Sequence, residues 1–191
     1  MGRFLDARSA DSRLRLAMAA VLLAGAAVRL WEYLGNASLW IDELALSESI
    51  LHRSLIDLLL RPLALGQSAP AGFLVAVKLS TMLLGTSELA LRVPSLLFTL
   101  ASLPLFAAAA RRYLSGWAAV FATALFAFGW QLFHYSAEVK QYAGDVMVAA
   151  LLLLVAFDLS LPSPPKSAYR RGAVAGALGV WFSMPAAFVV A

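Results

Sequence analysis

Two adjacent carboxylates, Asp42 and Glu43, stand shortly after the first long apolar run of the chain, within residues 39–45. A carboxylate at a membrane boundary can stay ionised and meet a substrate from water or from lipid, whereas one inside the bilayer would be very costly. Acidic residues are also favoured in the first turn of any helix, and Asp is a good N-cap. The pair therefore predicts either chemistry at the outer mouth of a membrane protein or an ordinary helix start.

The composition identifies the class of protein that must position these carboxylates. Of 191 residues, 62% are hydrophobic and only 14% are charged, whereas a soluble domain is about half apolar and about a quarter charged. The net charge of +4 comes mostly from Arg at the ends of apolar runs, so it indicates membrane orientation, and no nucleic acid partner is expected. The absence of Cys excludes disulfides, thiol catalysis and Cys-ligated metal. His52 and His134 are not spaced as metal ligands and are expected to be solvated.

The fold class is all-α, a polytopic helical membrane protein with about five transmembrane helices, because several apolar runs approach the ~20 residues that cross a bilayer. Residues 1–13 are polar and basic and are predicted to form a cytoplasmic tail, and residues 36–87 the first extracytoplasmic loop. Arg29 is expected to snorkel to the outer interface beside Trp31 and Tyr33. The predicted spans are 14–34, 88–110, 116–133, 143–159 and 172–191.

Two juxtamembrane helices are predicted within the first outer loop. One begins near Asp42, and its leucines at 44, 51, 55 and 58 would form a single helical stripe ending before the break at Arg61-Pro62. The other covers about 70–84, with Ser68 as its cap, Pro70 in its first turn and Gly85 at its end. At about 22 Å it is too short for a bilayer core of about 30 Å.

Charge chooses between two topologies. If the 70–84 helix does not span, both basic clusters (Arg111-Arg112 and 166–171) lie inside, as the positive-inside rule requires. If it spans, both clusters lie outside. The first topology also brings Asp42-Glu43 and the polar segment 134–142 to the same outer face, and convergence of two polar groups favours a site there.

Four segments in this order resemble GT-C glycosyltransferases: 40–43 (WIDE), 68–73 (SAPAGF), 85–95 (GTSELALRVPS) and 135–142 (YSAEVKQY). The closest resemblance is to the protein mannosyltransferase-like group, which includes RgtA/B/C/D-like bacterial enzymes. The resemblance implies transfer of a sugar from a polyprenyl-phosphate carrier to an extracytoplasmic acceptor (cell-envelope glycan, lipid or protein). Family members are longer, so the chain is expected to be the N-terminal part of such a transferase, and its Ala-, Leu- and Arg-rich composition favours a bacterial inner membrane.

The resemblance also implies roles for individual residues. Transfer from a phosphate-linked sugar needs a base for the acceptor hydroxyl and positive charge for the departing phosphate. Asp42 stands at the family's catalytic position and is the expected base, with Glu43 orienting the acceptor or helping to hold a metal. The expected substrate-binding residues are Lys140 as a phosphate contact, Glu138 positioning it, Arg92 (which could instead pair with Glu88), Pro70, and Tyr142, which with Tyr135 could equally be an interfacial aromatic.

Other functions and partners stay open at this point. The expected partners are the polyprenyl-phosphate sugar donor, the lipid bilayer and the extracytoplasmic acceptor; no cofactor is certain, and a divalent metal ion is left open. A transporter or flippase for lipid-linked sugars would show ionisable residues near the bilayer midplane and broken helices. A non-catalytic membrane scaffold would tolerate the loss of Asp42.

Overall fold

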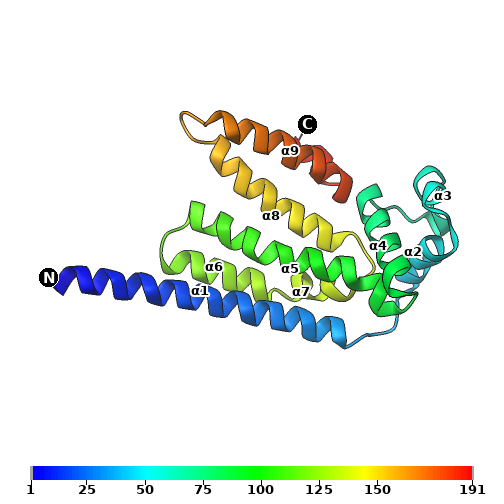
Figure 1. Cartoon of the computed structure of the whole chain (residues 1–191), viewed down its shortest axis with the longest axis horizontal. Helices are drawn as coiled ribbons and strands as arrows, with labels where there is room; N and C mark the ends of the chain where they lie inside the picture. Colours follow the sequence, from blue (N-terminus) through cyan, green and yellow to red (C-terminus); the bar gives the residue numbers. More distant parts are fainter. Residues whose placement is uncertain (1, 191) are drawn as a thin grey trace.

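The computed structural model describes residues 2–190, with side chains for residues 11–189, and this part of the chain contains helices and no strand. Five helices lie side by side as a bundle in the order α9, α8, α5, α6, α1, and α5 is central among them (Figure 1). The bundle helices are α1 (Gly2–Leu34), α5 (Glu88–Tyr113), α6 (Trp117–Phe128), α8 (Tyr142–Leu159) and α9 (Lys166–Phe182). The other helices are α2 (Ile41–His52), α3 (Leu55–Leu60), η1 (Ala64–Gly66), α4 (Ala71–Leu84), α7 (Trp130–His134), η2 (Tyr135–Ala137) and α10 (Ala186–Val190).

The apolar helices support an integral membrane protein with fewer spans than expected. Within the described residues, three helices are long and apolar enough to cross a bilayer: Asp11–Leu34, α5 and α8. A fourth span is formed if α6 and the Trp130–Ala137 segment, which meet at a bend of 58°, are counted as one. On α1, Leu16, Leu23 and Leu30 recur every seven residues and are exposed, as expected of a face that meets lipid tails. The predicted count of about five is therefore not confirmed.

The last predicted span, 172–191, differs most from the structure. The helix there, α9, begins six residues earlier, at Lys166, and ends after 17 residues at Phe182. The residue before a proline is disfavoured in helical conformation, and Met184 precedes Pro185. This break separates α9 from the short α10 and leaves no continuous apolar helix over the predicted range.

The Arg29 side chain of α1 stabilises the break between α6 and α7 by hydrogen bonding. The break at Gly129 deprives carbonyls near the end of α6 of their helical N–H partners. The Arg29 guanidinium donates from Nη1 to the Ala127 carbonyl at 2.8 Å and to the Gly25 carbonyl at 3.0 Å. The Ser136 hydroxyl is 3.2 Å from the Arg29 carbonyl, which ties η2 to α1. The prediction that Arg29 snorkels to the interface is wrong, because the side chain is fully buried against this bend.

The central helix α5 continues through Pro94 and Pro104. A proline lacks the N–H that would bond to the carbonyl four residues earlier, so Pro94 leaves the Ala90 carbonyl without its helical partner. The Ser80 hydroxyl of α4 donates to that carbonyl at 2.6 Å. The repair fits the rule that backbone groups away from water must find partners within the protein, and it fastens α4 to α5.

Small residues let the helices approach closely. A Cβ added at Gly25 would stand 2.9 Å from the Ala127 Cβ, so α1 and α6 touch at this point. A Cβ added at Gly144 of α8 would stand 2.8 Å from the Phe182 carbonyl oxygen at the end of α9. Close backbone approach of this kind is how helices associate where no hydrophobic effect drives them together.

The two helices predicted between the first and second spans are present, with one correction. The chain leaves helical conformation at Arg53, so α2 and α3 are separate helices and the predicted leucine stripe is not continuous: Leu58 is buried, whereas Leu44 is exposed. Helix α4 matches the predicted 70–84 range, but Pro70 is its N-cap in place of Ser68; Gly85 ends it with a φ of 88°. Lys78, in the middle of α4, donates to the Ile50 carbonyl at the end of α2 at 2.8 Å.

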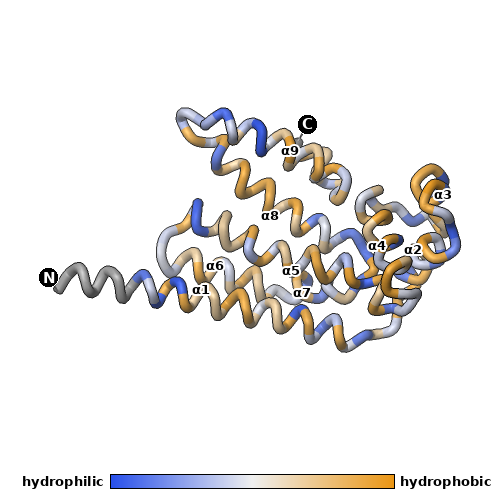
Figure 2. The backbone as a smooth tube through the Cα atoms, in the orientation of Figure 1, coloured by the Kyte–Doolittle hydropathy of each residue, from blue (hydrophilic) through white to orange (hydrophobic). Residues whose placement is uncertain are grey.

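Helices α2, α3 and α4 gather at one end of the bundle (Figure 1). The loop end is the end formed by residues 36–87 and 129–142; the basic end, opposite to it, is formed by residues 11–15, 111–116 and 158–171. Apolar residues follow the middles of the long helices and hydrophilic segments lie at their ends (Figure 2). Helix α4 lies at the loop end and does not run along the bundle. The connections after it are therefore arranged as in the predicted topology in which the 70–84 helix does not span.

Candidate functional site

A cavity of about 440 Å³ opens at the loop end, between the start of α2 and the segment that joins α7 to α8. It contains both polar groups that the sequence singled out, which lie about a hundred residues apart along the chain. The fold therefore brings Asp42-Glu43 and the 134–142 segment together, as predicted. Its lining consists of Trp40, Ile41, Asp42, Glu43, His134, Glu138, Lys140 and Tyr142.

Asp42 is the accessible carboxylate of the cavity, with a side chain 68% exposed. Its Oδ2 lies 3.6 Å from Lys140 Nζ, and its Oδ1 lies 3.5 Å from Gln67 Nε2. Lys140 donates from Nζ to Gln67 Oε1 at 2.7 Å and is itself mostly buried. The anion is thus held beside a cation and an amide while one side stays open to a reactant.

Glu43, the neighbouring residue, is buried, and each of its carboxylate oxygens accepts a backbone hydrogen bond. Its Oε1 accepts a hydrogen bond from the Val139 N–H at 2.6 Å, and its Oε2 accepts one from the Trp40 N–H at 3.0 Å. The Arg92 Nη2 lies 3.6 Å from Oε2. The bond back to the N-cap residue is the acidic half of a capping box, so Trp40 is the N-cap of α2. Glu43 therefore anchors α2 to the 134–142 segment through both of its oxygens.

Arg92 is buried at the side of α5 and reaches the linker between α1 and α2. Its Nη1 donates to the Ala37 carbonyl at 2.6 Å and lies 3.4 Å from Asn36 Oδ1. Its ion pair is with Glu43, so the pairing with Glu88 considered from the sequence is not formed. Because this buried arginine bonds a backbone carbonyl of the linker and the Glu43 carboxylate, it fixes the position of the linker relative to α5. The position of Asp42, which follows the linker, is fixed with it.

His134 joins two carboxylates that the sequence did not connect. Its Nδ1 lies 2.7 Å from Glu32 Oε1, at the end of α1, and its Nε2 lies 3.4 Å from Glu138 Oε1. The ring also stacks on Trp130 with centroids 4.7 Å apart. His134 is therefore held in place and not simply solvated. The sequence offered one signal for Glu32: it is the single acidic residue near the end of the first predicted span.

Glu138 has a perturbed pKa. Burial raises the pKa of its carboxyl above the ordinary value, and the nearby Glu43 carboxylate acts in the same direction. Positive charge from His134, Lys140 and Arg92 opposes the rise. A carboxyl with a raised pKa that faces a cavity is suited to exchanging protons with a bound ligand.

A second cavity of about 230 Å³ adjoins the first. Trp40, Glu43, His134 and Glu138 line both cavities, so these four residues form the wall between them. Arg92 and Glu32 line only the second. The loop end thus offers two adjoining compartments, one with Lys140 and Asp42 and one with Arg92, separated by the carboxylate and imidazole groups.

The remaining predicted residues are placed unevenly. Tyr142 lines the first cavity, with its ring 5.1 Å from that of Tyr135. Pro70 lines neither cavity and serves as the N-cap of α4. From the same loop it is Gln67 that reaches Asp42 and Lys140. No signal in the sequence distinguished Gln67 from other loop residues.

The side chains described, residues 11–189, include no group of three or more His, Asp or Glu residues that could hold a metal ion. The two carboxylates nearest to one another in the sequence, Asp42 and Glu43, point to different partners: one to Lys140 and Gln67, the other to Arg92 and backbone N–H groups. The site is therefore built on ion pairs and hydrogen bonds.

A family model described as dolichyl-phosphate-mannose-protein mannosyltransferase matches residues 68–191, more than half of the chain. The match includes Arg92, Glu138, Lys140 and Tyr142; Asp42 and Glu43 precede it. No curated protein and no solved structure matches the chain.

Proposed function

We propose a specific reaction for this chain, which belongs to the dolichyl-phosphate-mannose-protein mannosyltransferase family and is therefore a glycosyltransferase of the GT-C type that uses a lipid-linked sugar. The reaction is transfer of a sugar from a polyprenyl-phosphate donor to an acceptor on the extracytoplasmic side of the membrane. One observation carries the proposal: Asp42 is an exposed carboxylate at the mouth of a cavity, and Lys140 lies 3.6 Å from it.

The chemistry assigns complementary roles to these two side chains. An oxygen of the acceptor hydroxyl attacks the anomeric carbon, the bond from that carbon to the phosphate oxygen breaks, and the polyprenyl phosphate leaves with the bonding electrons. Asp42 takes the acceptor proton as general base, and Lys140 stabilises the negative charge of the departing phosphate. The Gln67 amide contacts both side chains and keeps the Asp42 carboxylate and the Lys140 ammonium at a fixed separation.

Glu43 and Arg92 have a positioning role in this proposal. Glu43 binds the Val139 N–H and so holds the backbone next to Lys140 at the start of α2. Arg92 holds Glu43 and the linker that precedes Asp42. Together they set the separation between base and phosphate contact without touching the substrate.

The active site of the proposed enzyme faces the periplasm or exterior of a bacterial inner membrane. The basic end carries Arg111, Arg112, Lys166, Arg170 and Arg171, and positive loops stay in the cytoplasm. The loop end is then extracytoplasmic. Single cysteines in this Cys-free chain test the orientation at two exposed positions, His52 and Ser115. In intact cells, an impermeant maleimide should label H52C and not S115C; the reverse pattern overturns the orientation.

Replacement of Asp42 by Asn tests the reaction. The chain in vesicles is supplied with a panel of polyprenyl-phosphate hexoses and pentoses together with a bacterial cell-envelope fraction as the source of acceptor hydroxyls, and release of polyprenyl phosphate is measured. The D42N variant should be slower by roughly 10²–10⁴-fold, the contribution of a general base, with unchanged membrane insertion. The matched control is Glu48→Gln, which removes an exposed carboxylate from the same helix, outside the cavity. Wild-type rates for D42N would exclude Asp42 as the base.

A transporter of lipid-linked sugars is the competing function, and the broken α6–α7 pair is the feature that favours it. Arg29 occupies that break with bonds to α6, so the freed carbonyl already has a protein partner. Movement of a labelled lipid-linked sugar across the vesicle bilayer without release of polyprenyl phosphate would favour transport over transfer.

A further inference from the structure

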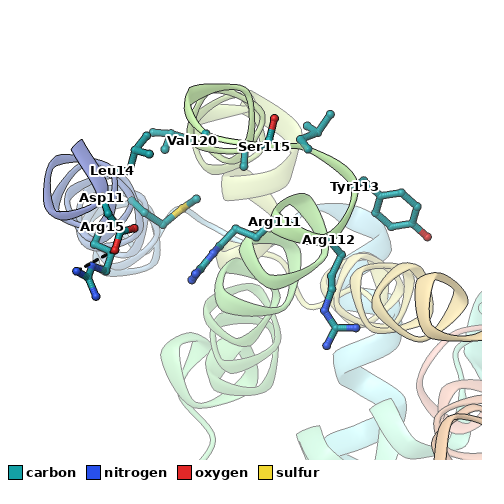
Figure 3. Close-up of a pocket in the computed structure, with 12 residues that line it drawn as sticks. Asp11, Leu14, Arg15, Arg111, Arg112, Tyr113, Ser115 and Val120 are labelled. Carbon is teal, nitrogen blue, oxygen red and sulfur yellow. Dashed lines mark ion pairs between the residues drawn. The ribbon is translucent and has the colours of Figure 1, made fainter. Parts of the chain in front are cut away.

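A crevice of about 450 Å³ lies at the basic end, far from the loop-end cavities, between α1, the end of α5 and the start of α6 (Figure 3). Its floor is apolar: Met18, Ala119 and Val120 are buried there and belong to one packed cluster. Leu14 and Leu114 line its sides. The crevice thus combines a firm apolar base with a charged rim at the level where a bilayer would meet water.

Three arginines and one aspartate line the rim, so the charged lining sums to +2. Arg15 is paired with Asp11 at 3.0 Å, but both side chains are about two-thirds exposed, and such pairs exchange partners at little cost. Arg112 is turned away to Asp158 of α8 and lies 5.8 Å from the Phe157 ring. Within the described side chains Arg111 has no ion pair, and Figure 3 shows it extending from α5 toward the α1 side that carries Arg15.

The start of α6 adds a second anion-attracting feature to the same rim. Ser115 and Gly116, the residues just before the helix, line the crevice. The N-cap is Gly116 and no side chain caps the helix, although the Ala118 N–H donates to the Ser115 carbonyl at 3.2 Å. Uncapped N–H groups at a helix start carry partial positive charge and bind phosphate groups readily.

We propose that this crevice binds an anionic phospholipid, with the phosphate-bearing headgroup held by Arg15 and Arg111, the start of α6 adding positive potential along the rim, and the start of an acyl chain against Leu14 and Leu114. Apolar lining beside the unpaired Arg111 and the exposed, weakly paired Arg15, between two membrane helices, matches an amphiphile with a negative headgroup, and basic pockets between helices are known lipid sites. The proposal does not depend on the transfer reaction, because none of its residues lies at the loop end.

Native mass spectrometry of the detergent-solubilised chain tests this proposal. Phosphatidylglycerol is titrated against the wild type, with phosphatidylcholine as the zwitterionic reference. The Arg15→Gln, Arg111→Gln double variant should bind phosphatidylglycerol roughly 30-fold more weakly, since each arginine contributes about fivefold near an anionic lipid. Binding of phosphatidylcholine should not change.

Two further variants separate a site from general charge attraction. Arg13→Gln removes one positive charge from the exposed side of the same helix, outside the crevice, and should leave binding unchanged. Ser115→Glu keeps all arginines and places a negative charge at the exposed rim, so it should weaken phosphatidylglycerol binding even if the double variant folds poorly.

Three outcomes would overturn the proposal. One is equal binding of the two lipids by the wild type. Another is a loss in R13Q as large as the loss per arginine in the double variant, which would mean attraction by net charge. The third is binding of glycerol 3-phosphate as tight as that of phosphatidylglycerol, which would make the crevice a site for free phosphate esters.

Discussion

The surroundings of the loop-end cavities and the basic end handle charge differently. Around the cavities, charged or titratable side chains from distant parts of the sequence pair largely out of water: Glu43 with Arg92, and Glu32 with His134. Outside the cavities, on α2 and α3, the pairs are one helical turn apart and largely exposed. At the basic end, Asp11 and Arg15 are one helical turn apart and mostly exposed, and Asp158 meets arginines that are about half exposed. Position along the helices alone does not explain the contrast, since both sets lie at helix ends.

The difference fits the two proposals made for these regions. Removing a carboxylate and a guanidinium from water costs free energy that is recovered only when geometry and hydrogen bonds are good. A buried pair with good geometry holds its side chains in fixed positions, as a reaction site requires. Exposed arginines keep their charge available to a membrane surface, where attraction needs no fixed partner. Variants at the two ends should therefore differ greatly in their effect on stability.

The largest loss of stability is expected for Arg92→Met. It leaves the buried Glu43 carboxylate without its cation and the Ala37 carbonyl without its donor. Breaking a buried pair from one side costs about 3–5 kcal/mol. Thermal unfolding of the purified chain in detergent measures the loss. Arg61→Met, which removes an exposed arginine paired with Asp57 at the same end, should change little; equal effects would show that burial is not the cause.

A smaller loss, about 2 kcal/mol, is expected for Arg29→Met, because bonds from a charged donor contribute about 1.5–3 kcal/mol each while the buried charge itself is costly. The variant frees the Ala127 carbonyl at the α6–α7 bend. The same unfolding measurement applies. A variant as stable as the wild type would mean that the cost of burying the guanidinium cancels its bonds, two of its nitrogens being unpartnered.

A third effect concerns pH. Burial raises the pKa of Glu138 in the folded chain, so its contribution to stability is fully present below the unfolded pKa and is lost as pH rises through the folded pKa. Glu138→Gln cannot titrate and should lose less stability than the wild type as pH rises through this window. Melting temperatures measured across weakly acidic to neutral pH check the slope. Glu48→Gln, an exposed acid, should keep the wild-type slope.

The smallest effect is expected at the basic end. Asp11→Asn removes an exposed pair one helical turn apart, and pairs of this kind contribute about 0.2–0.5 kcal/mol. Melting curves should coincide with those of the wild type within error, and salt should not separate them further. A shift as large as that of Arg29→Met would contradict the contrast between the two ends.

The helices themselves were largely predictable, and the departures have local causes. Continuous apolar runs predicted α5 and α8 closely, and turn residues such as Gly85 and Arg61-Pro62 predicted the ends of α4 and α3. The prediction of one continuous helix from 42 to 60 is wrong at Arg53-Ser54. There the Ser54 hydroxyl accepts a hydrogen bond from the Asp57 N–H and caps the start of a new helix. The fifth span failed because Ser183 and Pro185 interrupt it.

Some members of the candidate site were predictable from the sequence, but their roles were not, and the predicted Pro70 lies outside both cavities. Resemblance and position indicated Asp42, Glu43, Glu138 and Lys140, and all four line one cavity. Which carboxylate is open and which is buried could not be read from adjacent letters, because successive residues on a helix point about 100° apart and only neighbouring elements determine what each one meets. Glu32, Gln67 and His134 were missed because their partners lie tens of residues away.

Composition and apolar run length alone determined that this chain is a helical membrane protein, since the bilayer requires long apolar helices whose backbone groups are satisfied internally. Charge at the run ends favoured the topology in which α4 does not span. Only the tertiary structure decided that Glu43 is an anchor, that Asp42 is the accessible carboxylate, and that Arg29 closes a broken helix. Those distinctions depend on burial and on contacts between distant segments, which exist only once the helices have packed.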